Sequence, residues 1–241
     1  MAIRLLILSE RLRTIAGFIE EGSDVADIGT GHGHLPVYLA QKGLARRIFA
    51  SDVSVDSLEA ARVASVKYGV EDRIKFIASP GLTGLSESDA DTIVLSGMGG
   101  ETISHILADA PWTKRCGIRL ILQPQTKIGK LCFWLRENGY IIKDAELTRD
   151  KGRFYIVILS CPHMVRRASD PIFLEPEIEL LTVLAGKNDP CFNEYIDELF
   201  TKAFRAAEGM KAAGSPDYPR MAKSLEDLAM FKRRAVINGS C

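Results

Sequence analysis

The spacing of apolar residues changes along the chain and separates short apolar runs from longer segments of helical periodicity. Helical segments lie between the runs, as in SVDSLEAARVASVKYG at residues 54–69. Runs that are apolar throughout and alternate with helices predict a parallel sheet covered on both faces. The runs that read as strands cover residues 25–28, 47–52, 73–78, 91–96 and 118–123.

Helical periodicity also predicts an opening helix before the first run and the apolar face of the helix within 54–69. Leu12, Ile15 and Ile19 follow Ser9 at helical spacing and indicate an amphipathic opening helix that ends near Gly22. The helix within 54–69 is expected to have a mixed apolar face, formed by Leu58, Ala61, Val63 and Val66.

After the fifth strand, the alternation of apolar runs and helical segments ends. The apolar runs at 140–147 and 154–161 are separated only by TRDKGR, which is too short for a crossover helix, so they predict an antiparallel hairpin. Parallel strands that finish in such a hairpin resemble the sheet of class I S-adenosylmethionine-dependent methyltransferases. A dinucleotide-binding Rossmann sheet stays parallel throughout. The predicted fold class is therefore α/β with a Rossmann-like methyltransferase sheet.

A second, smaller domain is predicted from about residue 170, where the composition shifts. GSPDYP at 214–219 interrupts an apolar seam with the spacing of a coiled coil, which indicates an antiparallel helical hairpin. We expect a first domain over 1–165 and a helical domain over 170–241. The seam consists of Phe192, Ile196, Leu199, Ala203, Ala206 and Met210, and then of Met221, Leu225, Leu228 and Phe231.

Net charge, cysteine content and the N-terminal segment limit the classes of protein to which the chain can belong. The 241-residue chain has a formal net charge of +0, so any nucleic-acid contact must come from local basic patches. Its five cysteines are odd in number, widely spaced and without a Cys-x-x-Cys pair, which argues against a disulfide framework or structural zinc and favours a reducing cytoplasm. The start of the chain has neither the cleavage site of a signal peptide nor the length of a membrane span. We expect a soluble cytoplasmic protein with no membrane or metal partner.

The segment DIGTGHGHLPVYLA, residues 27–40, follows the first strand and carries the candidate chemistry. A dinucleotide fingerprint needs a third glycine where this chain has His34 or Pro36, and a metal site at His32 and His34 lacks further ligands. The readings that remain are a glycine-rich turn without a ligand and the methyltransferase pattern acid-x-Gly-x-Gly-x-Gly. In the second reading, the glycines let a cofactor approach the backbone, and the N-terminus of the next helix offers unpaired N–H groups to a carboxylate.

Three other strand ends add polar groups at the same edge. Asp52 ends the second strand, where a carboxylate can bind both ribose hydroxyls, although it can equally be a loop acid or the N-cap of the next helix. SGMGG at 96–100 ends the fourth strand and predicts either backbone exposed beside the cofactor or a tight turn. Gln123 ends the fifth strand and can read a base edge or pair with the backbone.

With these segments together, the chain resembles the bacterial tRNA (adenine-22-N1)-methyltransferases. The resemblance runs through LSERLRTIA, ADIGTGHGHLPVYLA, SGMGG, LILQPQ, WLRENGY, GRFYIVILS and the helical tail. It implies a class I methyltransferase domain with a C-terminal coiled-coil-like domain, and methyl transfer from S-adenosylmethionine to N1 of an adenine in the D-arm of tRNA. The chain departs from the family pattern at Gly31 and Pro80, where the family has acids, at Gln125, where it has Asn, and at His34, where Tyr is frequent.

The resemblance also implies roles for individual residues. Asp27, Gly29, Gly31 and Gly33 are expected at the methionine end of the cofactor and Asp52 at its ribose. Ser79 and Gly81 are expected near its adenine, and Gly97 beside it. Met98, Gly99 and Gln123 are expected on the acceptor side. His32 either orients the acceptor or fixes the loop.

A tRNA substrate requires contacts beyond the pocket, because a base in a tRNA arm must be extruded from its stack to expose N1. The candidate contacts are Arg149, Lys151 and Arg153 in the hairpin turn, Arg166 and Arg167 after it, and Lys232, Arg233 and Arg234 near the end. Each cluster can equally be a solvated face. Two alternatives stay open: a paralogue that binds S-adenosylmethionine with weak or lost tRNA methylation, and a methyltransferase with another acceptor. The oligomeric state and the set of tRNAs are also open.

Overall fold

The computed structural model describes residues 5–163 and 176–238 of the chain, which forms two compact units, Met1–Ile172 and Phe173–Cys241. The predicted domain boundary between residues 165 and 170 lies outside the described residues, as do Arg166 and Arg167. Each unit is described by itself.

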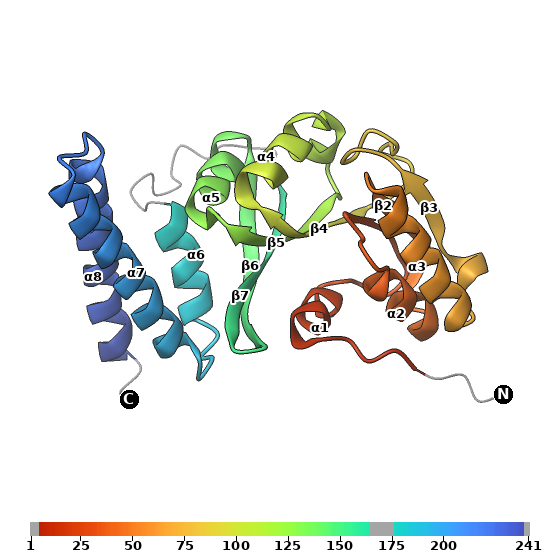
Figure 1. The fold of residues 1–241 in the computed structure, drawn as a ribbon, viewed down its shortest axis with the longest axis horizontal. Helices are drawn as coiled ribbons and strands as arrows, with labels where there is room; N and C mark the ends of the chain where they lie inside the picture. The colour runs from red at the N-terminus through yellow and green to blue at the C-terminus, as the bar shows by residue number, and fades with distance from the viewer. Residues whose placement is uncertain (1–4, 164–175, 239–241) are drawn as a thin grey trace. The chain divides into compact units, whose positions relative to one another are not determined.

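The first unit is built around a seven-stranded sheet with the order β3-β2-β1-β4-β5-β7-β6 (Figure 1). The strands β1 to β5 pair in parallel, as predicted from their uniformly apolar runs. The strands are β1 (Ser23–Ile28), β2 (Ala45–Asp52), β3 (Lys75–Ala78), β4 (Thr92–Gly99), β5 (Arg119–Thr126), β6 (Tyr140–Asp150) and β7 (Arg153–Pro162).

The predicted hairpin is confirmed, and its placement in the sheet goes beyond the prediction. β7 pairs antiparallel with both β5 and β6, so the last strand in the sequence lies between its two predecessors. The connecting turn is tighter than TRDKGR suggested, because Lys151 and Gly152 alone form it, with φ of 49° and 78°. Two successive residues of positive φ are typical of the type I′ turn that matches the twist of a hairpin.

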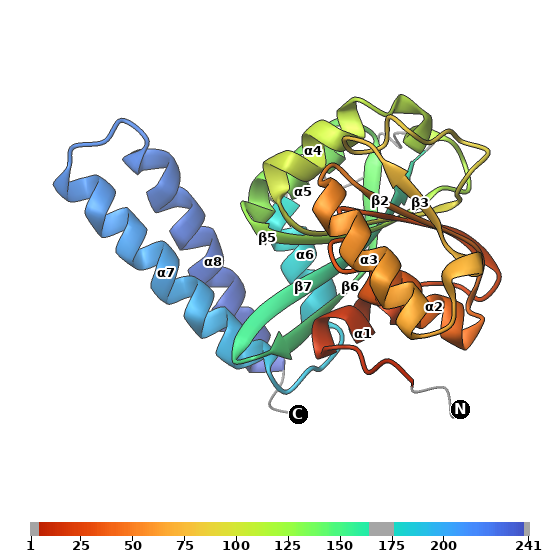
Figure 2. The ribbon, with the colours of Figure 1, turned by 45° about the vertical axis from the view of Figure 1, so that its right-hand side comes forward.

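Helices cover both faces of this sheet (Figures 1 and 2). Apolar residues of α1, α2 and α3 pack in one cluster on one face, and α4 and α5 lie across the sheet from them. The helices are α1 (Glu10–Gly17), α2 (His34–Lys42), α3 (Val55–Lys67), α4 (Gly100–Ala108) and α5 (Ile128–Glu137), with the 3-10 turns η1 (Glu71–Arg73) and η2 (Pro111–Lys114).

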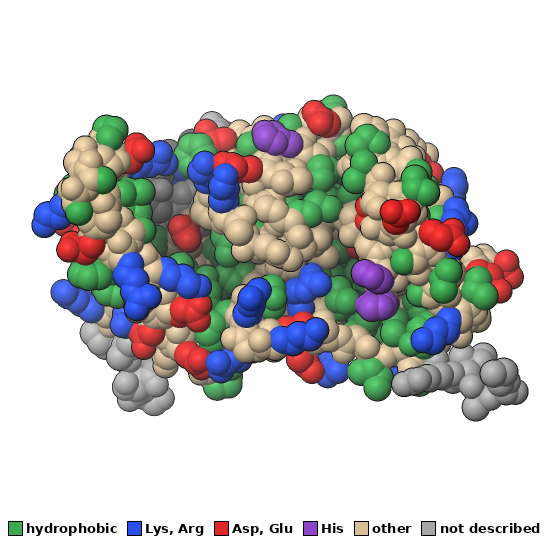
Figure 3. Space-filling model, viewed as in Figure 1, with side chains coloured by type: hydrophobic (Ala, Val, Ile, Leu, Met, Phe, Trp, Pro, Cys, Tyr) green, Lys and Arg blue, Asp and Glu red, His purple; other side chains and the backbone are tan. Residues whose placement is uncertain are grey.

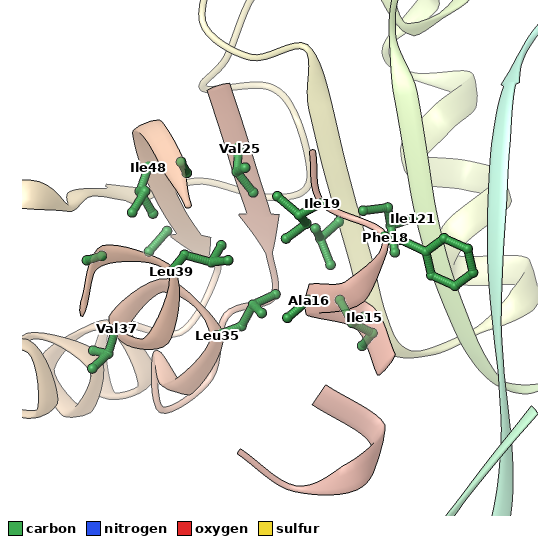
Figure 4. Packing of buried hydrophobic residues seen from close by; sticks show 14 of the residues in the cluster. Ile15, Ala16, Phe18, Ile19, Val25, Leu35, Val37, Leu39, Ile48 and Ile121 are labelled. Carbon is green, nitrogen blue, oxygen red and sulfur yellow. The ribbon is translucent and has the colours of Figure 1, made fainter. Parts of the chain in front are cut away.

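The core beneath α1 and α2 anchors the strands that carry the candidate site. Ile15 of α1 and Val25 of β1 are fully buried, and they lie among apolar side chains of α2, β2 and β5 (Figure 4). Because close-packed interiors resist displacement, this cluster fixes the carboxyl ends of β1 and β2 relative to each other.

Two details of the helix predictions were wrong. α1 ends at Gly17, five residues before Gly22, because Phe18 and Ile19 leave the helix to enter the core. In α3, Leu58 and Ala61 are buried as expected, but Val63 and Val66 are 59% and 61% exposed. At about 100° per residue, Val63 lies about 140–160° around the helix axis from Leu58 and Ala61, and Val66 about 80–140°, so one helix face cannot hold all four.

Within residues 176–238, the second unit consists of α6 (Pro176–Ala185), α7 (Phe192–Ala212) and α8 (Tyr218–Asn238). The predicted pair of helices is present as α7 and α8, which contact each other and are joined across the GSPDYP segment. The prediction missed α6, which contacts α8 and buries Leu180, Leu181 and Leu184. In a helix of ten residues with its acids confined to the first turn, too few polar positions mark a helical period.

Candidate functional site

The carboxyl ends of the parallel strands β1, β2 and β4 bring the first group of predicted residues together. Asp27 lies one residue before the end of β1, and Asp52 is the last residue of β2, its parallel neighbour. In open α/β sheets, ligands bind at this edge, next to the point where the strand order reverses. Here the order reverses between β1 and β4.

Asp27 is buried, and its carboxyl group is only sparsely bonded. Thr30 Oγ1 donates to Asp27 Oδ2 at 2.8 Å, and among the described residues no other donor bonds this carboxyl. Burial raises the pKa of Asp27 to about 6, while the Thr30 bond and the charge of Arg11 lower it and the charge of Asp52 raises it. With a single bonded donor, the Asp27 carboxyl has lone pairs left to accept a bond from a cationic ligand.

The glycine loop links the two acids. Gly29 N and Thr30 N both donate to the carbonyl oxygen of Ser51, at 2.8 and 3.0 Å. Gly31 N donates to Asp52 Oδ2 at 3.0 Å. The loop therefore folds over the end of β2 and holds the Asp52 carboxylate in place.

Asp52 is not the N-cap of the next helix, which was one of the readings left open. Ser54 has that position in α3, and its hydroxyl accepts from Ser57 N. The second carboxylate oxygen of Asp52 accepts from Ser54 N at 2.9 Å. Asp52 is thus 9% exposed and oriented by two backbone N–H groups, with lone pairs left on both oxygens.

The glycines of the loop differ in the space beside their backbone. All three have positive φ, at 71°, 55° and 68° for Gly29, Gly31 and Gly33. A Cβ at Gly33 would lie 2.7 Å from Ala61 Cβ in α3, so this glycine allows close packing of the loop on the helix. A Cβ at Gly31 would meet nothing within 4 Å, so the backbone there is open to a ligand. This open backbone beside two carboxylates fits a cofactor with hydroxyl and ammonium groups.

The β4–α4 connection lies against this loop. A Cβ at Gly29 would lie 2.3 Å from the Cε methyl of Met98, which therefore covers the Gly29 backbone. Gly97 is exposed, with φ of 79°, and Gly99 precedes α4 as its N-cap residue. The structure thus brings Met98 and the glycine loop into contact.

Gln123 is fully buried, and both ends of its amide are bonded within the protein. Its Oε1 accepts from Gly97 N at 3.1 Å and from Arg11 Nη1 at 2.9 Å, and its Nε2 donates to Pro124 O at 3.1 Å. This arrangement corresponds to the reading in which Gln123 pairs with the backbone.

Arg11 is a site residue that sequence reasoning missed. It reaches from α1 to Gln123 at the end of β5, and its guanidinium carbon lies 5.7 Å from the centre of the Tyr155 ring on β7. The available signal was a basic residue on the opening helix, inside the LSERLRTIA segment that carries the family resemblance.

Ser79 and Gly81 lie beyond the end of β3, next to Asp52. Ser79 N donates to Asp52 O at 3.1 Å, and Ser79 Oγ lies 2.8 Å from Thr83 Oγ1. Gly81 packs against α4, because a Cβ at this position would lie 3.1 Å from Ile106 Cγ2. Ser79 is therefore tied to the ribose-binding candidate Asp52, while the Cβ side of Gly81 faces α4.

His32 and His34 are both exposed, and their rings stack with centroids 5.9 Å apart. Adjacent histidine side chains are visible on the surface in Figure 3. Burial, followed by the charge of His32, lowers the pKa of His34. Among the described residues, no group of three or more His, Cys, Asp or Glu side chains is arranged to hold a metal ion.

The predicted RNA contacts differ in the partners that they already have within the protein. Arg149, Lys151 and Arg153 are exposed at the hairpin turn, and Arg149 lies over the ring of Phe154 at 5.2 Å. In the second unit, Lys232 forms an ion pair with Asp197 at 2.6 Å, and Arg233 and Arg234 are exposed. No helix in residues 5–163 or 176–238 has the length and hydrophobicity required to span a membrane.

Comparison with known proteins gives consistent matches. The family described as "Methyltransferase domain" matches residues 8–158. A tRNA (adenine(22)-N(1))-methyltransferase of Bacillus subtilis is 33% identical over 156 residues, which cover 64% of this chain and 65% of the relative, just under two thirds of its length. The second unit lies outside the residues matched by the family.

Solved structures match over almost the whole chain. The crystal structure of the B. subtilis m1A22 tRNA methyltransferase TrmK has a TM-score of 0.76 at 25% identity, covering 96% of this chain and 99% of that one. A structure of M. capricolum TrmK in complex with S-adenosyl-homocysteine has a TM-score of 0.76 at 21% identity, covering 94% and 98%. At 21% identity, the similarity to the M. capricolum structure shows that the two proteins share a fold.

Proposed function

The chain belongs to the methyltransferase domain family, and from this premise we propose that it transfers a methyl group from S-adenosylmethionine to N1 of adenine 22 in the D-arm of tRNA. The observation that carries the proposal is the pair of buried carboxylates, Asp27 and Asp52, which bond to Thr30 and Gly31 of the same loop, where the Gly31 backbone is open. The similarity to the B. subtilis enzyme supports the choice of acceptor.

The residues present suit each part of this cofactor. Asp27 would accept from the methionine ammonium, and the cation would in turn favour the ionised carboxylate despite its burial. The lone pairs of Asp52 that are not used by Gly31 and Ser54 would accept from the ribose hydroxyls. Ser79, bonded to Asp52 O, would lie toward the adenine, where Pro80 replaces the acid of the family pattern.

S-adenosylmethionine supplies an electrophilic methyl group when bound. Adenine N1 attacks with a lone pair and needs no general base, so the task of this chain is to position the base and to exclude water. Met98 and the glycines on either side of it form the surface that would receive the base. His32, exposed within the glycine loop, would contact the acceptor or its flanking nucleotide.

Reaching N1 requires extrusion of the base at a cost of about a few kcal/mol, which contacts elsewhere on the RNA must offset. Arg149, Lys151 and Arg153 supply exposed positive charge on the first unit, and Arg233 and Arg234 do so on the second. Because phosphate contacts release counterions, we expect tRNA binding to weaken steeply with salt. The free cysteines Cys116, Cys132, Cys161 and Cys191 fit a cytoplasmic location.

Two measurements test the proposal. The first is calorimetric titration with S-adenosylhomocysteine of the wild type, of Asp52→Ala, and of Asp56→Asn as a control, since Asp56 is exposed four residues further on. Loss of hydrogen bonds to a carboxylate should weaken binding by about tenfold or more in Asp52→Ala, and Asp56→Asn should bind as the wild type does.

The second is transfer of tritium from labelled S-adenosylmethionine to bulk tRNA from a strain that lacks the gene, followed by nucleoside analysis. Label in 1-methyladenosine is the expected result. Binding without transfer would identify a paralogue without tRNA methylation, and turnover with small molecules alone would identify another acceptor. No heat of binding with the wild type would refute the cofactor assignment.

A further inference from the structure

The β4–α4 connection, which presents Met98 to the site, contains a defect in the sheet. In the β4–β5 ladder, Ser96 pairs with Gln123 and Met98 pairs with Pro124, so Gly97 is skipped as a bulge. A bulged residue lies outside the ladder and redirects the side chains that follow it. The N–H of Gly97 instead donates to the side-chain oxygen of Gln123.

Arg11 helps to fix which end of the Gln123 amide faces that N–H. Gln123 Oε1 receives donors from both Arg11 Nη1 and Gly97 N, at 2.9 and 3.1 Å. The NH₂ group of the amide donates to Pro124 O at 3.1 Å and supports the same orientation. Without Arg11, Gln123 Oε1 loses one of its two donors, and less opposes a turned amide whose NH₂ group would face the N–H of Gly97 without an acceptor between them. A guanidinium has no acceptor atoms, so it enforces the orientation with oxygen toward the bulge.

The position of Arg11 is itself set by three elements. It belongs to α1, its guanidinium lies over the Tyr155 ring of β7, and Nη1 lies 3.8 Å from the position that a Cβ on Gly97 would take. Its contact with Gln123 joins residues that are 112 positions apart in the sequence. Arg13, two residues further along the same helix, is exposed and pairs only with Glu10 among the described residues.

We propose that Arg11 is a positioning residue, which holds the Gly97 bulge in one conformation through Gln123 and so fixes the surface that receives the acceptor base. Arg11 acts on the acceptor surface without touching the reacting atoms. The assignment of an acceptor base to this surface rests on the proposed function, whereas the effect of Arg11 on the bulge does not.

The same guanidinium couples this surface to the cofactor end. Its charge favours the ionised form of Asp27, and the other charged group acting on Asp27 is Asp52 at the end of β2. Removal of Arg11 therefore raises the pKa of Asp27 further. Cofactor binding, which needs the carboxylate, should then be lost at a higher pH than in the wild type.

The test uses the full chain with Arg11→Met, Arg11→Lys and the control Arg13→Met. The first readout is hydrogen–deuterium exchange of the peptide around Gly97 in protein without cofactor. Exchange there should be faster by roughly tenfold or more in Arg11→Met, because a bonded N–H has become free to open, and unchanged in Arg13→Met. This readout is independent of the proposed function.

The second readout is S-adenosylhomocysteine affinity and methyl transfer between about pH 5 and 9. We expect Arg11→Met to lose affinity at a higher pH than the wild type and to lower kcat by roughly ten- to a hundredfold, as misplacement of reacting groups does. Arg11→Lys should keep the wild-type pH profile, because it keeps the charge, while lowering kcat.

Exchange at Gly97 equal to that of Arg13→Met, or an unchanged pH profile in Arg11→Met, would overturn the inference. If Arg11→Met does not fold, Arg11→Lys decides: faster exchange at Gly97 supports the role, and wild-type exchange contradicts it. Absence of S-adenosylhomocysteine binding by the wild type would refute the proposed function and leave the exchange result standing.

Discussion

Replacing Asp27 by Asn should make the protein without cofactor more stable at neutral pH while abolishing cofactor binding. Asn preserves the size of the side chain and can still accept from Thr30, but it cannot ionise. The buried carboxylate has Thr30 as its hydrogen-bond donor, so its negative charge is poorly compensated in the folded protein. Function and stability are therefore opposed at this position.

The magnitude follows from the pKa. Burial raises the pKa of Asp27 from 3.8 to about 6, and each unit corresponds to about 1.4 kcal/mol. Ionised Asp27 thus costs the folded state about 3 kcal/mol at about pH 7.5. The folded state binds this proton more tightly than the unfolded state does, so the cost declines as the pH falls through 6 toward 3.8. About half of it should remain at pH 5.

The assay is urea-induced unfolding of the wild type and Asp27→Asn at about pH 7.5 and 5, followed by tryptophan fluorescence. Trp112 and Trp134, the two tryptophans of the chain, both lie in the first unit. Asp27→Asn should exceed the wild type in free energy of unfolding by up to about 3 kcal/mol at the higher pH and by roughly half as much at the lower.

Asp24, on the same strand and equally buried, is the matched control. Its carboxylate accepts from Arg46 and Arg47, and these bonds hold its pKa well below the usual range. Asp24→Asn should therefore destabilise the protein at both pH values. An Asp27→Asn variant that is less stable than the wild type at neutral pH, or whose advantage does not shrink on acidification, would refute the reasoning.

Three further predictions concern the glycine loop, helix α3 and the hairpin turn that is proposed to contact RNA. Gly33→Val should lower the free energy of unfolding by about 2–5 kcal/mol in urea titration, because a Cβ there meets Ala61 and the residue has positive φ. Ser54→Ala removes the N-cap of α3 and should lower the free energy of unfolding by about 1 kcal/mol in the same assay. Ser54→Gly is the control and should have little effect, because Gly is also a good N-cap residue. Replacing Arg149 and Arg153 together by Gln should reduce the slope of log tRNA affinity against log salt by about 1–2, and an unchanged slope would exclude the hairpin turn from the interface.

The sequence alone predicted the elements whose signals are local. The apolar runs at 25–28 and 47–52 carry acids at or next to their last residue, and because parallel strands end at one edge of a sheet, the sequence already places Asp27 and Asp52 together. The hairpin was predicted from another local signal, the short spacing between the runs at 140–147 and 154–161. Too few residues separate these runs for a crossover helix.

Tertiary structure decided what depends on contacts between distant segments. The periodicity of α1 cannot show that Arg11 reaches Gln123, 112 residues away, nor can the apolar run of β7 show that it lies between β5 and β6. The pKa of Asp27 is likewise a property of the groups that surround it. Local patterns specify which segments are buried, but charge and hydrogen bonding at the site are set by side chains that the fold brings together from α1, β1, β2, β4 and β5.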